Sequence, residues 1–297
     1  MNLEPAFDLD RYLRVSGAIK PESIDWTLPQ ARLSDDALFT IAYMMDIESH
    51  TIVYLRDLLS THVVRENEVT AFLSCWAYEE FFHSLLLRRF LATQNVAIDD
   101  QRFADLRSRT SLADHLIRPG IAILSRLTRH FPAVHMTFGA INEISTLTGY
   151  NALIRAIEDP RDGSGGRRSL LTTILERIIK DERRHFSFYF NQARLRLGPP
   201  AARRLTAFLV RNFWTPVGVT VRGDPSMRRV CAFLFPGPTG VEQLASVDRT
   251  IARLPGLEWF NLGANYARRT QSSAASAQTR NRNRLGAKHF DFTVTAN

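Results

Sequence analysis

Four long segments of the chain carry apolar residues at alternating steps of three and four, and each of these rows holds one glutamate near its middle. The first two rows are Ile41, Met45, Glu48, Ile52, Leu55, Leu59 and Leu73, Trp76, Glu80, His83, Leu87, Phe90. The other two are Met136, Ala140, Glu143, Leu147, Tyr150, Leu153 and Leu171, Leu175, Ile178, Glu182, His185, Tyr189. Such spacing is typical of helix faces that meet in the core of a bundle. The rows therefore predict an all-α protein whose core contains four carboxylates.

The four glutamates need positive partners if they are buried together. An unpaired carboxylate costs several kcal/mol to bury, and four at one level would repel one another and take up protons. Two histidines complete the pattern, since His83 follows Glu80 by three positions and His185 follows Glu182 by three. Residues three apart share a helix face, so each pair can bind one metal ion.

One glutamate from each of two helices and a Glu-x-x-His motif from each of two others form the ligand set of carboxylate-bridged di-metal bundles. A single Glu-x-x-His motif is weak, because most such motifs lie on solvated surfaces. Two copies about a hundred residues apart, each on an apolar row, carry the prediction. Mixed carboxylate and imidazole ligands favour iron or manganese over zinc. The predicted ligands of the two metal ions are Glu48, Glu80, His83, Glu143, Glu182 and His185.

The rest of the chain is arranged around this predicted bundle. Residues 1–33 contain three prolines and are expected to form an irregular N-terminal arm. Residues 34–267 are expected to form one helical domain, with the bundle core at about 35–196 and additional peripheral helices at 201–267. Residues 268–297 are rich in Ser, Ala, Asn and Arg, a composition that predicts a basic, disordered tail.

Local signals place the expected helices. Ser34 is a predicted N-cap followed by two acidic residues, and residues 159–166 form the clearest loop. The expected long helices cover about 34–62, 67–93, 132–158 and 168–196, with a helix broken at Pro119 over 111–130. Shorter helices are expected at 201–213, 224–234 and 240–253.

Composition narrows the class of protein. The chain has 297 residues and is 45% hydrophobic and 23% charged, as expected for a soluble globular protein. Its net charge is +8, but residues 268–297 carry six basic residues against one acidic residue, which leaves +3 for the body. So small an excess is not the footprint of a nucleic-acid-binding surface.

The expected compartment is the cytoplasm. Cys75 and Cys231 lie far apart and form neither a metal-binding pattern nor a disulfide framework. No apolar run reaches the length of a membrane span. The N-terminus is acidic and lacks the apolar region of a signal peptide.

The motifs around the predicted ligands resemble those of a known family. Residues 76–83 are Trp-Ala-Tyr-Glu-Glu-Phe-Phe-His, residues 181–185 are Asp-Glu-Arg-Arg-His, and residues 143–146 are Glu-Ile-Ser-Thr. They are similar to the Trp-x-x-Glu-Glu-x-x-His, Asp-Glu-x-x-His and Glu-x-x-Thr signatures of the soluble acyl-carrier-protein desaturases of the ferritin-like superfamily. The resemblance covers about 35–195 and departs from the family at Phe81 and Phe82, where polar or basic residues are usual.

The resemblance implies a ferritin-like four-helix bundle that holds two iron ions with the six predicted ligands, Glu80 and Glu182 being the bridges. It implies that Thr146 delivers protons to reduced oxygen. It also implies that Asp181 accepts the other ring N–H of a liganding histidine and so fixes its tautomer. The alternatives are a core hydroxyl bonded to its own helix for Thr146 and a solvent-facing acid for Asp181.

The implied activity is a dioxygen-dependent attack on an unactivated C–H bond of an acyl chain, which yields an alkene or an alcohol. The implied partners are a ferredoxin-like reductant, an acyl carrier protein or other tethered acyl substrate, and a second copy of the chain in a homodimer.

Trp76 is expected to pack in the core rather than to relay electrons, and Trp26 is a relay candidate from the arm. The candidate channel residues are Phe81, Phe82, Phe138 and Leu147. A basic patch for an acidic carrier is expected from Arg88, Arg89, Lys180, Arg183 and Arg184.

Other di-iron classes share these ligands. An N-oxygenase carries an extra histidine where this chain has Ile178, and a ribonucleotide reductase small subunit carries a radical tyrosine where it has Leu87. A tRNA hydroxylase needs a stronger positive surface, whereas nothing in the sequence excludes an aldehyde-processing oxygenase. The further alternative is a non-enzymatic iron-binding or storage bundle, which assembly into a cage would distinguish.

Overall fold

The structure, a computed structural model, describes residues 7–59, 61–108, 123, 125, 127–158 and 169–273. Within these residues all regular secondary structure is helical, as predicted. The longest helices are α2 (Asp35–Leu58), α3 (Asn67–Thr93), α6 (Phe131–Ile157) and α7 (Leu170–Arg196). They are the segments that carry the four glutamate-containing rows. No helix in the described part of the chain has both the length and the apolar character needed to cross a bilayer.

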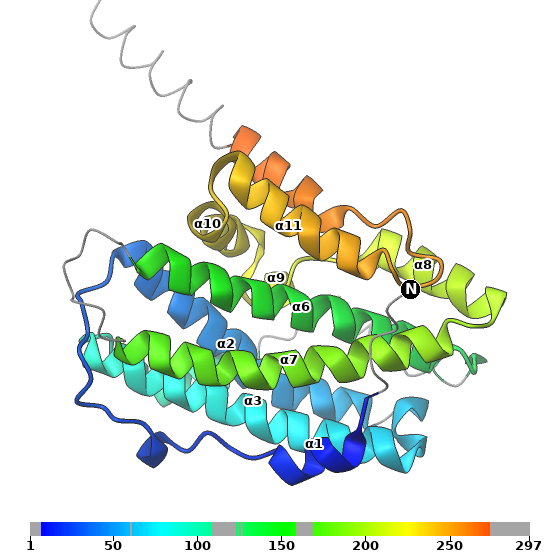
Figure 1. Ribbon diagram of the computed structural model, residues 1–297, viewed down its shortest axis with the longest axis horizontal. Helices are drawn as coiled ribbons and strands as arrows, with labels where there is room; N and C mark the ends of the chain where they lie inside the picture. Colours follow the sequence, from blue (N-terminus) through cyan, green and yellow to red (C-terminus); the bar gives the residue numbers. More distant parts are fainter. Residues whose placement is uncertain are drawn as a thin grey trace, which may run out of the picture.

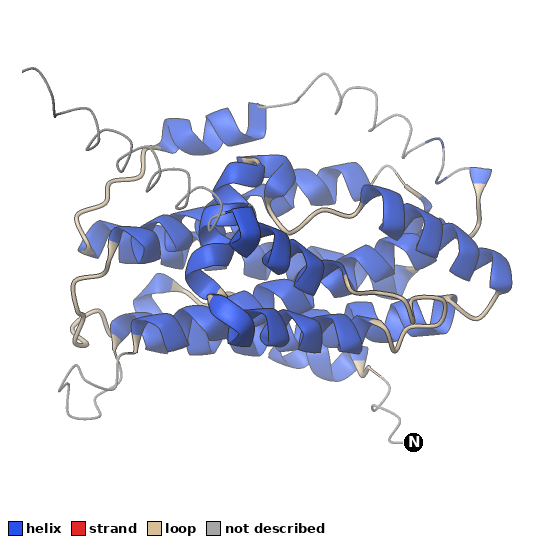
Figure 2. Cartoon of the chain, turned by 90° about the horizontal axis from the view of Figure 1, so that it is seen from above, coloured by secondary structure: helices blue, strands red, loops and turns tan. Residues whose placement is uncertain are grey.

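The four long helices pack side by side as two antiparallel pairs (Figure 1). α2 lies against α3 and α6 lies against α7, while smaller contacts of α3 with α7 and of α2 with α6 join the pairs. An outer layer covers the α2–α6 side of this bundle. It consists of α8 (Pro200–Phe213), α9 (Val219–Arg222), α10 (Asp224–Leu234), α11 (Gly237–Ile251) and a further helix over 262–273. Figure 2 shows the described helices and their loops from above.

Local sequence signals determine where two of the long helices begin. The Ser34 hydroxyl accepts a hydrogen bond from Ala37 N at 3.2 Å, and the Ser169 hydroxyl accepts one from Thr172 N at 3.1 Å. Both serines satisfy backbone N–H groups that the first turn of a helix leaves without a partner. The starts of α2 and α7 therefore follow from residues that the sequence alone shows.

The apolar core forms two clusters with the buried glutamates between them. One cluster includes Leu73 and Met136, which precede the glutamates of α3 and α6. The other includes Leu87 and Leu153, which follow those glutamates. Burying one large apolar side chain stabilises a fold by about 1.5–3 kcal/mol. The two clusters therefore hold the helices together on both sides of a polar layer.

The structure differs from three expectations about where helices form and end. The N-terminal arm is not irregular, because it contains α1 (Leu9–Val15) and the 3-10 turn η1 (Pro21–Ser23). α2 ends at Leu58 instead of near residue 62, and the 3-10 turn η2 (His62–Arg65) follows it. The helix over 262–273 extends into the expected tail, and Thr270 is buried in it. Packing against the bundle orders segments whose composition alone predicts loops.

α4 (Asp100–Ser108) is also not among the helices predicted from the sequence. Its Arg102 binds the fully buried carboxylate of Asp46 on α2 through Nε at 2.9 Å and Nη2 at 2.7 Å. Arg222 of α9 reaches the same carboxylate at 3.3 Å. A buried carboxylate is costly unless it is paired, so Asp46 fixes α4 and α9 against α2.

Two members of the predicted row on α2 are wrong. Ile52 and Leu59 are 39% and 53% exposed, whereas Val53 and Leu58 are 5% and 4% exposed. A straight α-helix drifts relative to a strict heptad pattern, so the buried face shifts by one position after Glu48. The helix expected over 111–130 falls mostly outside the described residues, and the loop expected at 159–166 lies wholly outside them.

Gly139 of α6 is expected to tolerate no side chain. A Cβ at this position would lie 2.2 Å from Cδ1 of the Tyr189 ring on α7. Gly139→Ala should therefore lower the free energy of unfolding by about 1–3 kcal/mol through overpacking, as measured by urea titration. The matched control is Gly149→Ala in the same helix, where the new methyl meets two side-chain ends, Met44 Cε at 3.3 Å and Leu234 Cδ1 at 4.0 Å. Equal losses in the two variants would contradict this steric explanation.

Candidate metal centre

The six predicted ligand side chains meet in one layer of the bundle. Each long helix contributes one glutamate, and α3 and α7 each add a histidine three residues later. All six side chains belong to residues that are between 0% and 6% exposed. Their donor atoms form two sets, each within 4.8 Å: Glu48, Glu80, His83, Glu182 and Glu80, Glu143, Glu182, His185. Glu80 and Glu182 belong to both sets, as expected of carboxylates that bridge two ions.

The atoms that face the middle of this layer lack hydrogen bonds. Glu80 Oε1, Glu182 Oε1, His83 Nδ1 and His185 Nδ1 are all buried without a hydrogen-bond partner. His83 Nδ1 lies 3.4 Å from Glu182 Oε1 and His185 Nδ1 lies 2.9 Å from Glu80 Oε1, but neither contact has hydrogen-bond geometry. An unsatisfied buried polar group costs about 1–3 kcal/mol. The donor set therefore fits a pair of metal ions, whose bonds would replace the missing hydrogen bonds.

The outer ring nitrogens of the two histidines are held by acids in a crossed arrangement. His83 Nε2 lies 3.0 Å from Asp181 Oδ2, and His185 Nε2 lies 2.8 Å from Glu79 Oε2. Each acid directly precedes the glutamate of one motif and binds the histidine of the other. Such a carboxylate favours the proton on Nε2, which leaves a lone pair on Nδ1 for a metal. Arg184 joins the two acids, at 3.1 Å from Glu79 Oε1 and 2.5 Å from Asp181 Oδ1.

Glu79 is a site residue that was not predicted from the sequence. It is 1% exposed and accepts hydrogen bonds from Tyr12 OH at 2.8 Å, Ser16 Oγ at 3.0 Å and Gly17 N at 3.0 Å. Burial disfavours its charge, but His185 and Tyr12 outweigh burial and lower the pKa of Glu79 to about 2. The signal for it is the acid-Glu-x-x-His pattern that both motifs share. The N-terminal arm thus supplies part of the site.

Two further side chains lie against the layer. Tyr150 OH donates a short hydrogen bond to Glu48 Oε1, and Trp76 Nε1 donates one to Glu143 Oε1 at 3.1 Å. Trp76 is 5% exposed, so it is a core residue that also contacts a candidate ligand. Asp181 is 5% exposed, so the alternative of a solvent-facing acid is wrong.

Burial and mutual repulsion raise the pKa of three carboxyl groups in the layer. Burial and the charge of Glu182 raise the pKa of Glu80 to about 7. Burial is the larger cause and the charge of Glu80 the next, and together they raise the pKa of Glu48 well above its ordinary value. Burial followed by the charge of Glu182 does the same for Glu143. A raised pKa favours the protonated carboxyl group, and a metal ion must displace each proton that is bound.

Glu182 and His83 ionise more readily than their neighbours. Burial opposes the charge of Glu182, but His185 and His83 outweigh it and lower the pKa of Glu182 to about 2. Burial likewise opposes a charge on His83, yet Asp181 and Glu182 raise the pKa of His83 to about 9. His83 must therefore also lose a proton before its Nδ1 lone pair can bind a metal.

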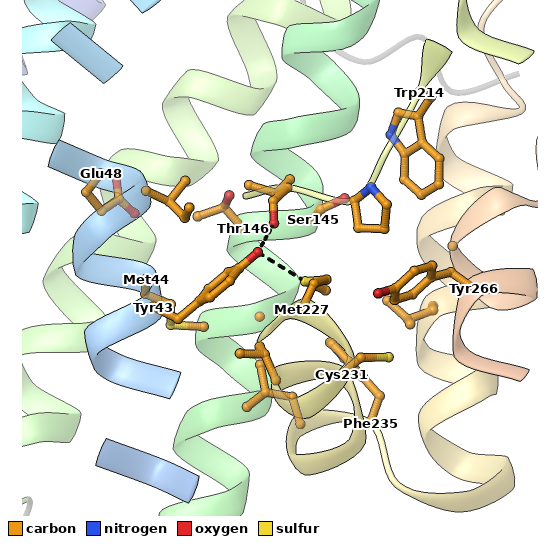
Figure 3. Close-up of a pocket in the computed structure, with 18 residues that line it drawn as sticks. Tyr43, Met44, Glu48, Ser145, Thr146, Trp214, Met227, Cys231, Phe235 and Tyr266 are labelled. Atoms are coloured by element: carbon orange, nitrogen blue, oxygen red, sulfur yellow. Dashed lines mark hydrogen bonds between the residues drawn. The ribbon is translucent and has the colours of Figure 1, made fainter. Parts of the chain in front are cut away.

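An apolar cavity of about 90 Å³ lies beside the layer, between α2, α6 and the outer helices (Figure 3). Glu48 and Thr146 line it on the bundle side, so one candidate ligand faces the cavity. Figure 3 shows Cys231, Phe235 and Tyr266 of the outer layer on the other side. Glu48 is the one charged side chain among the described residues that line it.

Thr146 presents its hydroxyl differently from its neighbours. The hydroxyls of Ser145 and Thr148 donate to carbonyls of their own helix, at Ile141 O and Ile144 O. No such bond is recorded for Thr146 within the described part of the chain, and its side chain lines the cavity. The alternative of a core hydroxyl bonded to its own helix is therefore wrong.

The predicted channel residues lie elsewhere. Phe81, Phe82, Phe138 and Leu147 are absent from the walls of this cavity as far as the described residues show. Phe81 and Phe82 are partly exposed and contact each other, with ring centroids 5.7 Å apart. Phe138 and Leu147 pack against the two apolar clusters. The outer helices, which the sequence motifs do not cover, decide where the cavity lies.

Internal contacts occupy much of the predicted basic patch. Arg184 bridges the two buried acids, and Arg88 binds Asp100 Oδ1 at 2.6 Å. The guanidinium carbon of Arg89 lies 4.3 Å from the centroid of the Trp26 ring. The exposed members of the predicted patch are Arg89, Lys180 and Arg183, and of these Lys180 and Arg183 lie on α7.

No family model, no curated protein and no solved structure matches this chain. The resemblance of its motifs to a family therefore stays a prediction. What the site can do follows from its own geometry: two sets of buried donor atoms at ion-binding distance, next to an apolar cavity.

Metal ions should stabilise the protein more as the pH rises. The pKa values of Glu80 and His83, about 7 and about 9, lie above their ordinary values. In the metal-free protein, the raised pKa values of these two groups stabilise the fold fully at low pH, and this contribution is lost as the pH rises through those values. At higher pH, a metal ion that binds the two groups also has fewer protons to displace. The rise in melting temperature on anaerobic addition of Fe(II) should grow from about pH 6 to about pH 9. A rise that shrinks over this range would contradict the assignment of these two ligands.

Glu79→Gln should weaken metal binding without removing a ligand. The substitution keeps the size of the side chain but removes the charge that holds His185 Nε2. Loss of such an outer partner typically lowers metal affinity by about 10–100-fold, which anaerobic titration with Fe(II) can measure. Glu68→Gln, at an exposed position of the same helix, is the matched control. Equal affinities in the two variants would show that Glu79 does not position the histidine.

Proposed function

We propose that the protein is a ferritin-like di-iron enzyme that uses dioxygen to oxidise an unactivated C–H bond of an apolar acyl chain. The observation that carries the proposal is that Glu48 belongs both to the candidate metal layer and to the wall of the apolar cavity. A chain in this cavity would have a carbon atom next to the metal layer. Two iron ions bound there would activate dioxygen with electrons from an external donor.

The chain's own residues would bind and orient the substrate. The apolar walls exclude water and offer no hydrogen bond to a polar group along most of their area. Tyr150 holds one oxygen of Glu48, which limits how that carboxylate can turn. Thr146, whose side chain lines the cavity, carries the hydroxyl that would hold and pass a proton at its edge.

The shape and chemistry of the cavity favour a hydrocarbon over the other substrates of di-iron enzymes. A nucleotide or a charged amine would need polar partners, and the described cavity wall has Glu48 as its one charged group. An aldehyde-processing oxygenase would bind the same kind of chain, and its product would distinguish it. Iron fits the mixed carboxylate and imidazole donors better than zinc.

The partners in this proposal come from the resemblance of the motifs. They are an acyl carrier protein or other tether for the chain, a ferredoxin-like electron donor and a second copy in a homodimer. Lys180 and Arg183 are the exposed basic residues available on α7 for an acidic partner.

Product analysis tests the function directly. Protein loaded anaerobically with Fe(II) should bind two ions per chain and, with reductant and dioxygen, convert a carrier-bound acyl chain to an alkene or an alcohol detectable by mass spectrometry. Glu80→Ala and His185→Ala should fold but bind little iron, since each removes a ligand. Normal binding of two ions by these variants would overturn the ligand assignment. Absence of iron and manganese after supplemented expression would overturn the di-metal proposal itself.

A size measurement separates catalysis from storage. The proposal expects a dimer, whereas a storage protein assembles into a cage. A cage would overturn the enzymatic proposal even if iron binds at the predicted ligands.

Filling the cavity should abolish turnover and spare the metal site. A Cβ on Gly149 would lie 3.3 Å from Met44 Cε and 4.0 Å from Leu234 Cδ1, so a larger side chain must enter the cavity. Gly149→Leu should lower turnover by roughly tenfold or more, because a displaced carbon loses its alignment with the site. Gly149→Ala, which adds one methyl, should have a much smaller effect. Full turnover by the leucine variant, with iron content unchanged, would place the substrate elsewhere.

A further inference from the structure

A group of four aromatic side chains lies next to the candidate metal layer and has no part in the function proposed above. Each long helix supplies one member, and we call the group the aromatic layer: Tyr54 from α2, Trp76 from α3, His135 from α6 and Tyr189 from α7. Trp76 and His135 precede the glutamates of their helices, whereas Tyr54 and Tyr189 follow theirs. Because paired helices run in opposite directions, all four residues lie on the same side of the metal layer.

The aromatic layer is a closed ring of contacts. The ring centroids of Tyr54 and Trp76 are 6.2 Å apart, and those of Trp76 and Tyr189 are 5.7 Å apart. The centroids of Tyr189 and His135 are 5.7 Å apart, and those of His135 and Tyr54 are 5.8 Å apart. Each member therefore contacts two others, so no gap in the ring interrupts electronic contact.

Core packing alone does not explain the polar atoms in this layer. Tyr54 OH lies 3.0 Å from His135 Nδ1, while His135 Nε2 and Tyr189 OH are buried with no hydrogen-bond partner. Unsatisfied buried polar atoms are destabilising, and apolar side chains of similar size would fill the same space without that cost. The layer keeps oxidisable rings and a base where leucine or phenylalanine would be more stable.

The aromatic layer connects the candidate metal layer with the outside of the bundle. At its inner side, Trp76 Nε1 donates a hydrogen bond to Glu143 Oε1 at 3.1 Å. At its outer side, Tyr54 is only partly buried, unlike the other three members. An electron could thus enter at Tyr54 and leave at Trp76 without exposing the metal layer to water.

We propose that the aromatic layer is an electron relay in which Tyr54 and His135 form the unit that releases an electron and a proton together. This proposal rests on the proposed function, because the electron acceptor would be the di-metal centre after its oxidation by dioxygen. In the relay step, Tyr54 would lose one electron, which would pass through Trp76 to that centre when the six candidate ligands hold iron. The O–H bond of Tyr54 breaks and its proton forms an N–H bond at His135 Nδ1, which leaves a neutral phenoxyl radical and an imidazolium. An external one-electron donor then reduces the radical, and His135 returns the proton.

The surroundings of the two tyrosines in the aromatic layer, Tyr54 and Tyr189, decide which of them can take this role. A phenol that loses an electron becomes a strong acid, so it needs a base within hydrogen-bond distance. His135 is such a base, because burial, helped by the charge of Arg196, lowers its pKa to about 3 and keeps the ring neutral. Tyr189 OH has no acceptor, and Tyr43 OH donates at 2.7 Å to the carbonyl of Val217, which cannot take up a proton.

Photo-oxidation of the metal-free, full-length protein tests the relay apart from the metal chemistry. A ruthenium photosensitiser with an oxidative quencher would remove one electron after a light flash, and transient absorption with electron paramagnetic resonance would record the tyrosyl radical. Tyr54→Phe, which keeps the ring and removes only the hydroxyl, should lower the long-lived radical yield several-fold. His135→Gln, which removes the base, should shorten the lifetime of the radical. Circular dichroism of each variant checks that it is folded.

Tyr43→Phe is the matched control, because it removes a buried phenol that has no base. Its radical signal should equal that of the unaltered chain. An unchanged yield in Tyr54→Phe, or equal losses in Tyr54→Phe and Tyr43→Phe, would overturn the relay.

A second measurement ties the relay to the metal layer. In iron-loaded, oxidised protein, Trp76→Phe should slow reduction by a small one-electron donor several-fold, with the rate expressed per bound iron. An unchanged reduction rate would overturn the role of Trp76. Because the flash experiment needs no metal, its failure would leave the di-iron proposal standing, and failure of iron binding would leave the Tyr54–His135 result standing.

Discussion

The burial of four carboxylates and two imidazoles in one layer is the interaction on which the rest of the structure depends. Moving a charge into the core costs more than an ordinary hydrogen bond returns, and the raised pKa values of Glu48, Glu80 and Glu143 reflect that cost. Hydrogen bonds from outside the layer offset part of this cost of burial, because Asp181 and Glu79 bind the outer nitrogens of the two histidines. The inner donor atoms face one another without partners, so cations are the natural completion of the layer.

Segments outside the four long helices complete this site. The N-terminal arm surrounds Glu79 with hydrogen-bond donors, so the acid that orients a histidine is itself oriented by residues far away in sequence. The outer helices close the cavity that Glu48 lines. Without the outer helices, the four long helices would keep the same candidate ligands but would lack one wall of this apolar cavity.

The surroundings of the layer differ in chemistry, which suits the function we propose. The cavity beside Glu48 is apolar and would hold the substrate. The aromatic layer lies against Glu143 through Trp76 and would carry electrons. Substrate and electrons would thus approach the layer at different candidate ligands, the substrate at Glu48 and the electrons at Glu143.

The sequence alone determined the all-helical class, the four long helices and the six candidate ligands, because helix periodicity and the Glu-x-x-His spacing depend on residues within one or two turns. It did not determine that α2 shifts its buried face at Val53, since that depends on which helices pack against it. Nor did it show that Glu79 binds His185, that Thr146 faces a cavity, or that Tyr54 lies against His135. These contacts join side chains from different helices, and only the packing of those helices decides which of them meet.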